Sequence, residues 1–184
     1  MGYPRSSVTE ARQMNPSPKE SAVCFLIYPK NDVWHTVFML RPDGNRVHSN
    51  QLGFPGGRIE EGETALEAAL RETEEEVGIR PEPSDVLGNL KEIYIPPSHF
   101  VVTPFVVLLQ SEPVFTPNAD EVVSLIETPL HVFLQNNITS EKEIFIQMLG
   151  RNVMAKYFSV GGQTLWGATA MMVQEFRELF GYSV

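Results

Sequence analysis

Three glutamates near the middle of the chain have a spacing that suits metal chemistry. Glu72, Glu75 and Glu76 lie at positions i, i+3 and i+4, so a helix turning about 100° per residue places them on one face. Carboxylates at this spacing repel one another, and the C-terminal end of a helix disfavours anions further. A hard cation such as Mg²⁺ or Mn²⁺ would offset both effects, because its preferred ligands are oxygen atoms. The pattern predicts a metal site, with a solvated acidic helix surface as the alternative.

The helix expected to carry these acids has recognisable ends. Thr64 and Glu67 form a capping box that predicts its start, and Gly78 is typical of a left-handed C-terminal stop. Another set of side chains forms the stripe expected to be buried: Leu66, Ala69, Leu70, Thr73 and Val77. The acids therefore lie beside the buried stripe, on a separate face.

The segments around this helix read as strands and turns. Apolar runs predict strands at residues 22–28, 36–40, 86–95, 101–109, 121–126, 143–147 and 153–160. A hairpin loop is expected at 29–33 and an irregular turn at 54–57. Residues 168–180 predict an amphipathic helix, whose apolar side chains form core or, alternatively, a homodimer surface. We expect a flexible N-terminal arm over residues 1–20 and a single mixed α/β (α+β) domain over residues 21–184.

Composition excludes several classes of protein. The 184 residues contain 14 Lys and Arg against 23 Asp and Glu, a net charge of −9 that disfavours binding to a nucleic-acid backbone. No apolar run approaches the ~20 residues that span a bilayer, and the N-terminus does not have a secretory-signal pattern. The single Cys24 excludes an internal disulfide framework and a multi-cysteine zinc site. We expect a cytoplasmic protein with no nucleic-acid or membrane partner.

The acidic helix belongs to a longer pattern of fixed spacings. Glu63 follows Gly57 after five residues, and the pair Arg71-Glu72 follows after seven more, ahead of the two later glutamates and Gly78. This pattern resembles the Nudix box, G-x5-E-x7-R-E-U-x-E-E-x-G-U, where U is a bulky apolar residue. Every fixed position matches over residues 57–79, and the departure is Thr73 at the first U. The departure lies on the buried stripe, so it concerns packing rather than chemistry.

The resemblance implies a hydrolase of nucleoside diphosphates linked to another moiety. It implies a mixed β-sheet between α-helices, with the box as a loop–helix–loop, and attack of water on a pyrophosphate phosphorus with Mg²⁺ or Mn²⁺. The resemblance implies metal ligands at Glu72, Glu75, Glu76, the carbonyl of Gly57 and Glu63, which also supports the loop, with Arg71 orienting the cluster. The base that accepts the proton from water is left open between Glu76 and Glu121. The pair Asp120-Glu121 has a second interpretation, as a turn before a strand.

A second resemblance bears on the substrate. Residues 37–57 are similar to an additional motif of coenzyme A pyrophosphatases, L-[LF]-T-x-R-[SA]-x3-R-x3-G-x3-F-P-G-G. The matching positions are Phe38, Arg41, Arg46, Phe54, Pro55, Gly56 and Gly57, and the main departures are Met39, Pro42 and Asn50. Residues 99–105 and 165–170 also look like segments of that subfamily.

This second resemblance implies cleavage of coenzyme A (CoA) or a CoA thioester to 3′,5′-ADP and 4′-phosphopantetheine or its acyl derivative. The 3′-phosphate of CoA needs basic partners beyond the metal, and arginine suits such contacts. The expected substrate contacts are Arg41, Arg46, His48, Phe54 and Gly56. The alternatives are another nucleotide substrate, such as ADP-ribose, and a catalytically silent nucleotide sensor with the same fold.

Overall fold

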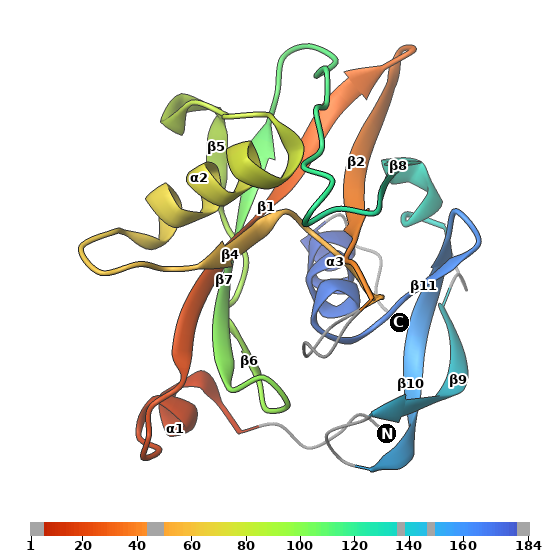
Figure 1. The fold of residues 1–184 in the computed structure, drawn as a ribbon. Coiled ribbons are helices and arrows are strands. Elements are labelled where there is room, and N and C mark those ends of the chain that lie inside the picture. Colours follow the sequence, from red (N-terminus) through yellow and green to blue (C-terminus); the bar gives the residue numbers. More distant parts are fainter. Residues whose placement is uncertain (1–5, 44–49, 136–138, 147–149, 180–184) are drawn as a thin grey trace.

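A mixed β-sheet forms the centre of the molecule in a computed structural model, which describes residues 6–43, 50–135, 139–146 and 150–179 (Figure 1). Its strands run in the spatial order β3 (Leu52–Gly53), β2 (Val33–Leu40), β1 (Lys19–Lys30), β7 (Phe100–Leu108) and β5 (Val86–Asn89). Three further strands join it: β4 (Gly56–Arg58) on β1, β6 (Ile93–Ile95) on β7 and β8 (Ser124–Pro129) on β2. Strands β1 and β7 are parallel, and the other pairs are antiparallel. The predicted mixed α/β (α+β) class is confirmed.

Helices cover the two faces of this sheet. Helix α2 (Ala65–Val77) packs on one face, and helix α3 (Gly167–Leu179) packs on the other (Figure 1). A smaller sheet stands beside α3, with the strand order β11 (Gln163–Leu165), β10 (Arg151–Val160) and β9 (Thr139–Ile146). The short 3-10 helices Pro83–Asp85 and Leu130–Val132 complete the connections. In the described residues, no helix is long and apolar enough to cross a membrane.

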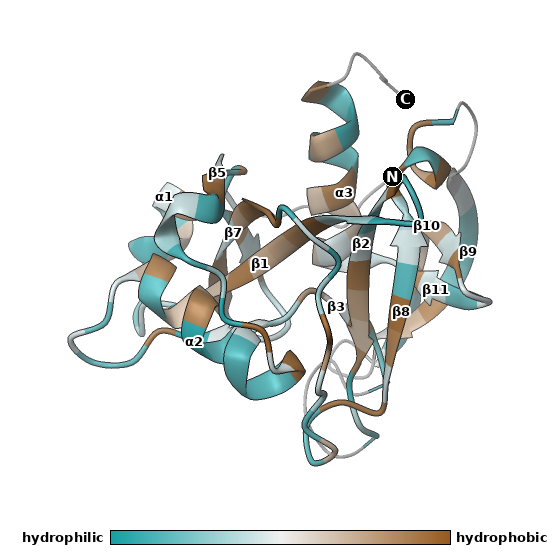
Figure 2. Ribbon diagram, turned by 90° about the horizontal axis from the view of Figure 1, so that it is seen from above, coloured by the Kyte–Doolittle hydropathy of each residue, from teal (hydrophilic) through white to brown (hydrophobic). Residues whose placement is uncertain are grey.

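The alternation of side chains along β1 supplies both halves of the core. Cys24 and Leu26 point toward the α2 side, whereas Phe25 and Ile27 point toward the α3 side, as the two-residue period of a strand requires. The Phe25 ring lies 4.7 Å from that of Phe176 of α3, between ring centroids. Figure 2 shows the resulting apolar strands running between the two helices.

The ends of α2 are those expected from the sequence. The Thr64 hydroxyl accepts a hydrogen bond from the Glu67 backbone N–H at 3.2 Å, while the Glu67 carboxylate accepts one from the Thr64 N–H at 2.8 Å. Gly78 ends the helix with φ +74°. Thr73 is fully buried, and its hydroxyl donates to the Ala69 carbonyl at 2.7 Å, which satisfies a polar group on the buried stripe.

Several strand predictions are corrected by the structure. The turn expected at 54–57 contains the start of β4, which pairs with β1. The strand expected at 86–95 is two strands, β5 and β6, separated at residues 90–92, and the strand expected at 121–126 begins at Ser124. These positions were missed because pairing with a neighbouring strand, rather than local composition, determines them.

Part of the segment expected as a flexible arm packs on the sheet. Residues Val8–Arg12 form α1, whose Ala11 is fully buried beside Tyr94 and Val101. Arg12 forms ion pairs with Glu20 and Glu92 at 2.9 and 2.8 Å.

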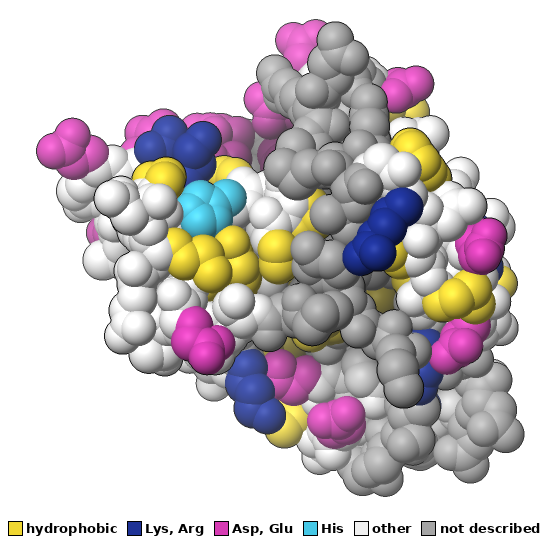
Figure 3. All heavy atoms as spheres, turned by 90° about the horizontal axis from the view of Figure 1, so that it is seen from below, with side chains coloured by type: hydrophobic (Ala, Val, Ile, Leu, Met, Phe, Trp, Pro, Cys, Tyr) yellow, Lys and Arg dark blue, Asp and Glu magenta, His cyan; other side chains and the backbone are white. Residues whose placement is uncertain are grey.

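On the face seen in Figure 3, acidic and basic side chains of the described residues are dispersed, and they form no continuous basic surface there.

Candidate active site

The Nudix-like box occupies β4, the loop after it and α2. Gly57 of β4 pairs with Ala22 of β1, and this pairing places its backbone directly against Glu72 of α2. A Cβ atom at position 57 would lie 2.3 Å from the Glu72 Cδ and 2.4 Å from each carboxylate oxygen. Glycine is therefore required here because it leaves room for the carboxylate beside the backbone.

Arg71 connects the acids of the box. Its Nε and Nη2 donate to the two oxygens of Glu63 at 2.8 and 3.0 Å, and Nη2 also donates to the Arg58 carbonyl at 3.2 Å. Its Nη1 donates to Glu72 and Glu75 at 3.1 and 3.0 Å. The Arg71 guanidinium keeps the pKa of the Glu63 carboxyl below its usual value. A single arginine thus joins the loop before α2 to two acids on the helix.

Glu76 differs from the other box acids because it is only 2% exposed. Its Oε2 accepts a hydrogen bond from the Gly56 N–H at 2.7 Å, and its Oε1 accepts one from Arg41 Nη1 at 3.2 Å. Burial raises the pKa of Glu76 to about 7, although the charge of Arg41 and the Gly56 hydrogen bond oppose the shift. The sequence placed this side chain on a face separate from the buried stripe, whereas the structure buries it under β4.

Glu121 joins the site from a distant part of the chain. Burial is the first cause that raises the pKa of Glu72, and the charges of Glu75 and Glu121 raise it further, against the effect of Arg71. The charge of Glu121 also raises the pKa of Glu76. Glu121 is exposed in the turn before β8, and its own carboxylate makes no hydrogen bond or ion pair with the described residues.

The backbone of Asn118 fixes this turn on α2. The Asn118 N–H donates to the Glu76 carbonyl at 2.9 Å, and the Asn118 carbonyl accepts from the Glu121 N–H at 3.0 Å. The Thr116 backbone N–H donates to the Val77 carbonyl at 2.9 Å. The loop therefore caps the C-terminal carbonyls of α2 and carries Glu121 to the acids of the box.

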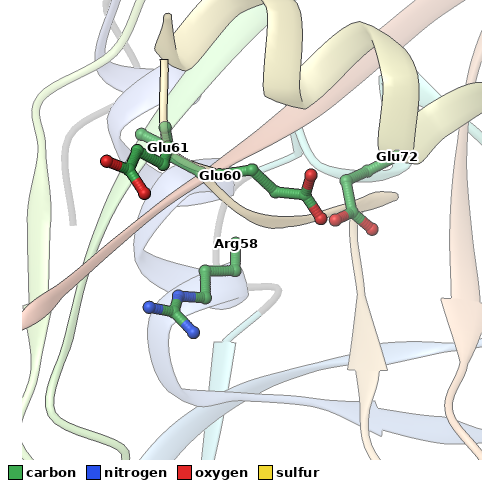
Figure 4. Close-up of a pocket in the computed structure, with 5 residues that line it drawn as sticks. Arg58, Glu60, Glu61 and Glu72 are labelled. Carbon is green, nitrogen blue, oxygen red and sulfur yellow. The ribbon is translucent and has the colours of Figure 1, made fainter. Parts of the chain in front are cut away.

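A hollow of about 330 Å³ lies beside Glu72. It is lined by Arg58, Ile59, Glu60, Glu61 and Glu72. In Figure 4 the carboxylates of Glu60 and Glu72 point toward each other. Sequence reasoning assigned no role to Glu60, although it belongs to the acidic block of residues 60–76. The hollow is open space next to the acids, where a ligand could approach.

The donor set suits a divalent cation in its chemistry. The carboxylates and the carbonyl of Gly57 offer hard oxygen ligands, and the missing Cβ at position 57 lets the Glu72 carboxylate lie directly against that backbone. As the side chains lie, no three His, Cys, Asp or Glu groups of the described residues surround a common point. The reason is that Arg71 and Arg41 hold the acids instead. Glu75 is 53% exposed, so its side chain is free to leave Arg71.

The structure places the expected substrate contacts in different environments. Phe54 is 2% exposed and stacks on Phe25, with ring centroids 4.4 Å apart, so the structure places it in the core rather than on a ligand surface. Gly56 and Arg41 both bind Glu76. Arg46 and His48 lie outside the described residues.

A mixed sheet between two helices, with a capped acidic helix following a glycine-containing strand, defines the Nudix class of fold. The sequence model of the NUDIX domain matches residues 18–149, and the chain belongs to the Nudix family. A protein of Yersinia pestis (strain Pestoides F) named Uncharacterized Nudix hydrolase NudL is 32% identical over 139 residues, covering 75% of this chain and 68% of that protein.

Solved structures have the same fold at low sequence identity. A MutT/nudix family protein from Enterococcus faecalis has a TM-score of 0.60 and 14% identity, covering 98% of this chain and 66% of its own. The NUDIX domain of Shewanella oneidensis NrtR, complexed with ADP ribose, has a TM-score of 0.53 and 17% identity, with coverages of 71% and 88%. A MutT NUDIX hydrolase from Burkholderia pseudomallei has a TM-score of 0.52 and 17% identity, with coverages of 86% and 97%. The chain is thus a Nudix hydrolase, a class that generally uses divalent metal ions.

Proposed function

We propose that this protein hydrolyses the pyrophosphate bond of CoA or its thioesters to 3′,5′-ADP and 4′-phosphopantetheine or its acyl derivative. The observation that carries the proposal is the similarity of residues 37–57 to the coenzyme A pyrophosphatase motif, which continues directly into the box. The segment ends at Gly57, against Glu72, and its Arg41 and Gly56 contact Glu76.

The box acids are proposed as the ligands of Mg²⁺ or Mn²⁺. This set comprises Glu72, Glu75, Glu76 and the Gly57 carbonyl, with Glu63 in support. A divalent cation bound there would lower the pKa of the attacking water and shield the charge of the phosphates. Arg71 holds the acids in place from the side of Glu63.

Glu121 is our choice for the base that accepts the proton from water, with Glu76 as the alternative. Both oxygens of Glu76 already accept hydrogen bonds, from Arg41 and Gly56. Glu121 is exposed, its carboxylate has no such partner among the described residues, and its charge acts on both Glu72 and Glu76. It is therefore the better placed group to bind and deprotonate a water molecule.

A different nucleotide substrate such as ADP-ribose is the second candidate. The specific observations in its favour are the departures at Met39 and Pro42, and the use of Arg41 within the protein itself. The NUDIX domain of NrtR, which has a similar fold, binds ADP ribose. For the chain as a whole we propose a cytoplasmic protein with a single catalytic domain, on which α1 packs, and no nucleic-acid or membrane partner.

Incubation with Mg²⁺ and separately with CoA, dephospho-CoA, ADP-ribose and a dinucleoside polyphosphate tests the substrate. Products are identified by mass. The proposal predicts the fastest turnover with CoA, releasing 3′,5′-ADP. Faster turnover of ADP-ribose or the polyphosphate would overturn the CoA assignment and leave the family activity intact. Failure to cleave any of the four substrates would contradict the catalytic proposal and favour a sensor.

A further inference from the structure

Arg41 follows the last residue of β2 and turns its side chain toward β4. Its backbone N–H donates to the Gln51 carbonyl at 3.2 Å, which ties it to the segment before β3. Its Nη1 donates to Glu76 Oε1 at 3.2 Å, and its Nη2 donates to the Gly56 carbonyl at 3.0 Å. Since Gly56 N–H in turn donates to Glu76 Oε2 at 2.7 Å, the three residues form a closed ring of hydrogen bonds.

We propose that Arg41 is a positioning residue that holds Glu76 in the orientation needed for catalysis, rather than a binding group for the substrate's 3′-phosphate. The inference rests on the proposed function, because it assigns Glu76 to the catalytic site. It replaces the substrate role that the sequence motif implied for Arg41.

The burial of Glu76 explains why such a residue is needed. A carboxylate that is 2% exposed must find its hydrogen-bond donors within the protein, and each of its oxygens has one here. Without the guanidinium, Oε1 would lose its donor and its opposite charge, and the side chain would lose its fixed direction. The planar guanidinium reaches Glu76 through Nη1 and the Gly56 carbonyl through Nη2, whereas lysine would offer a single nitrogen and so reproduce this geometry only in part.

If Arg41 turned Nη1 and Nη2 onto a substrate phosphate, it would withdraw them from Glu76 and the Gly56 carbonyl and weaken this ring. Taking a hydrogen bond away from a buried charge is costly, which disfavours that exchange. Arg58 offers an alternative, because it lines the hollow beside Glu72 and its side chain makes no hydrogen bond or ion pair with the described residues. Arg58 can therefore bind an anionic group of the substrate without disturbing Glu76.

The test compares kcat and KM for CoA and dephospho-CoA in the wild type, Arg41→Gln and Arg41→Lys. Arg151→Gln is the matched control, because Arg151 is an exposed arginine of β10 with no such partner among the described residues. We expect Arg41→Gln to lower kcat about 100-fold for both substrates, with KM unchanged. In Arg41→Gln, the ratio of kcat/KM for CoA to kcat/KM for dephospho-CoA should stay within about twofold of the wild-type ratio. Arg41→Lys should recover part of kcat, because it keeps a donor and the positive charge near Glu76.

Two binding measurements separate positioning from substrate contact without turnover. We expect Arg41→Gln to weaken Mn²⁺ binding, measured by electron paramagnetic resonance, about tenfold, and to leave the affinity for 3′,5′-ADP unchanged. A loss restricted to CoA, with normal rates on dephospho-CoA and weaker binding of 3′,5′-ADP, would overturn the proposal. Wild-type rates in Arg41→Gln would overturn it as well.

The role of Arg41 can be tested whichever substrate the wild type cleaves. If the wild type cleaves ADP-ribose but not CoA, the CoA assignment fails, and the same variants are compared on ADP-ribose with the same expected fall in kcat. If Arg41→Gln does not fold, as judged by circular dichroism, Arg41→Lys carries the comparison. An Arg41→Lys protein with a normal kcat and a raised KM would then contradict a positioning role.

Discussion

Gly56 and Gly57 lie where the acids of α2 come closest to the backbone of β4. The sequence identified Gly57 and the box acids by their spacing, because each position of the pattern is local. It did not reveal that Glu76 is buried or that Arg41 is its partner. Those contacts join residues far apart in sequence, so only the packing of β2, β4 and α2 creates them.

Replacement of Gly57 by alanine tests the close approach of Glu72. The added Cβ would lie 2.3 Å from the carboxylate carbon, so Glu72 must move, and we expect kcat to fall about 100-fold with little change in thermal stability. Gly53→Ala is the matched control, because its Cβ would meet only the Arg41 Nε at 3.8 Å, an ordinary contact distance. Normal activity in Gly57→Ala would contradict the assigned position of Glu72.

The raised pKa of Glu76 predicts a pH dependence of the metal-free protein. An acid with a pKa of about 7 in the folded state holds a proton that the unfolded chain has already lost above its ordinary value of 4.5. The contribution of Glu76 to folding free energy therefore falls as pH rises from about 4.5 to 7, by on the order of 3 kcal/mol, and then levels off.

Urea unfolding between pH 5 and pH 8 measures this dependence. In Glu76→Gln the decline over this range should shrink, because glutamine does not titrate. Glu74→Gln, which changes a partly exposed acid of the same helix, should retain the wild-type decline. An equal decline in Glu76→Gln and the wild type would show that another group is responsible.

Among the secondary-structure elements, α2 was predictable and β4 was not. Helix α2 is bounded by a capping box at Thr64 and a glycine at position 78, and both signals act within one turn of the helix. Strand β4 depends on contact with β1: a Cβ at Gly56 would lie 2.3 Å from the Ala22 carbonyl oxygen. The composition of residues 54–57 gives no indication of that neighbour, so a turn was expected.

Gly78 connects α2 to the loop that carries Glu121, and alanine there should disturb both. The residue has φ +74°, and a Cβ would lie 2.8 Å from the Thr116 Cβ, so backbone strain and a clash act together. We expect Gly78→Ala to destabilise the fold by about 2–3 kcal/mol and to lower kcat about tenfold, by displacing the loop.

Gly162→Ala separates strain from displacement of the loop. Its φ is +77°, yet nothing lies within 4 Å of an added Cβ. This variant should lose about 1 kcal/mol of stability in chemical unfolding and keep normal activity. If both variants retained the same kcat, the loop would not position a catalytic group.

At the scale of the whole molecule, the sandwich of helices around the sheet brings three distant segments to one place. Strand β4, the face of α2 and the turn before β8 meet around Glu72, Glu76 and Glu121. The net charge of −9 and the concentration of acids there would repel a pyrophosphate substrate. Binding of such a substrate therefore depends on cations that offset the negative charge. The divalent metal ions generally used by Nudix hydrolases would supply that positive charge.

Metal-dependent hydrolysis at the box acids is measured by the turnover of a nucleoside diphosphate derivative by the wild type, Glu75→Gln and Glu74→Gln, with Mg²⁺ and with chelator. The two glutamates are neighbours with similar exposure, but Glu74 pairs with Arg80 at 3.0 Å, whereas Glu75 pairs with Arg71 of the box. We expect Mg²⁺-dependent turnover that falls at least about 100-fold in Glu75→Gln and stays within about twofold in Glu74→Gln. Equal rates in both variants, or turnover unaffected by chelator, would show that the box acids do not hold a catalytic metal ion.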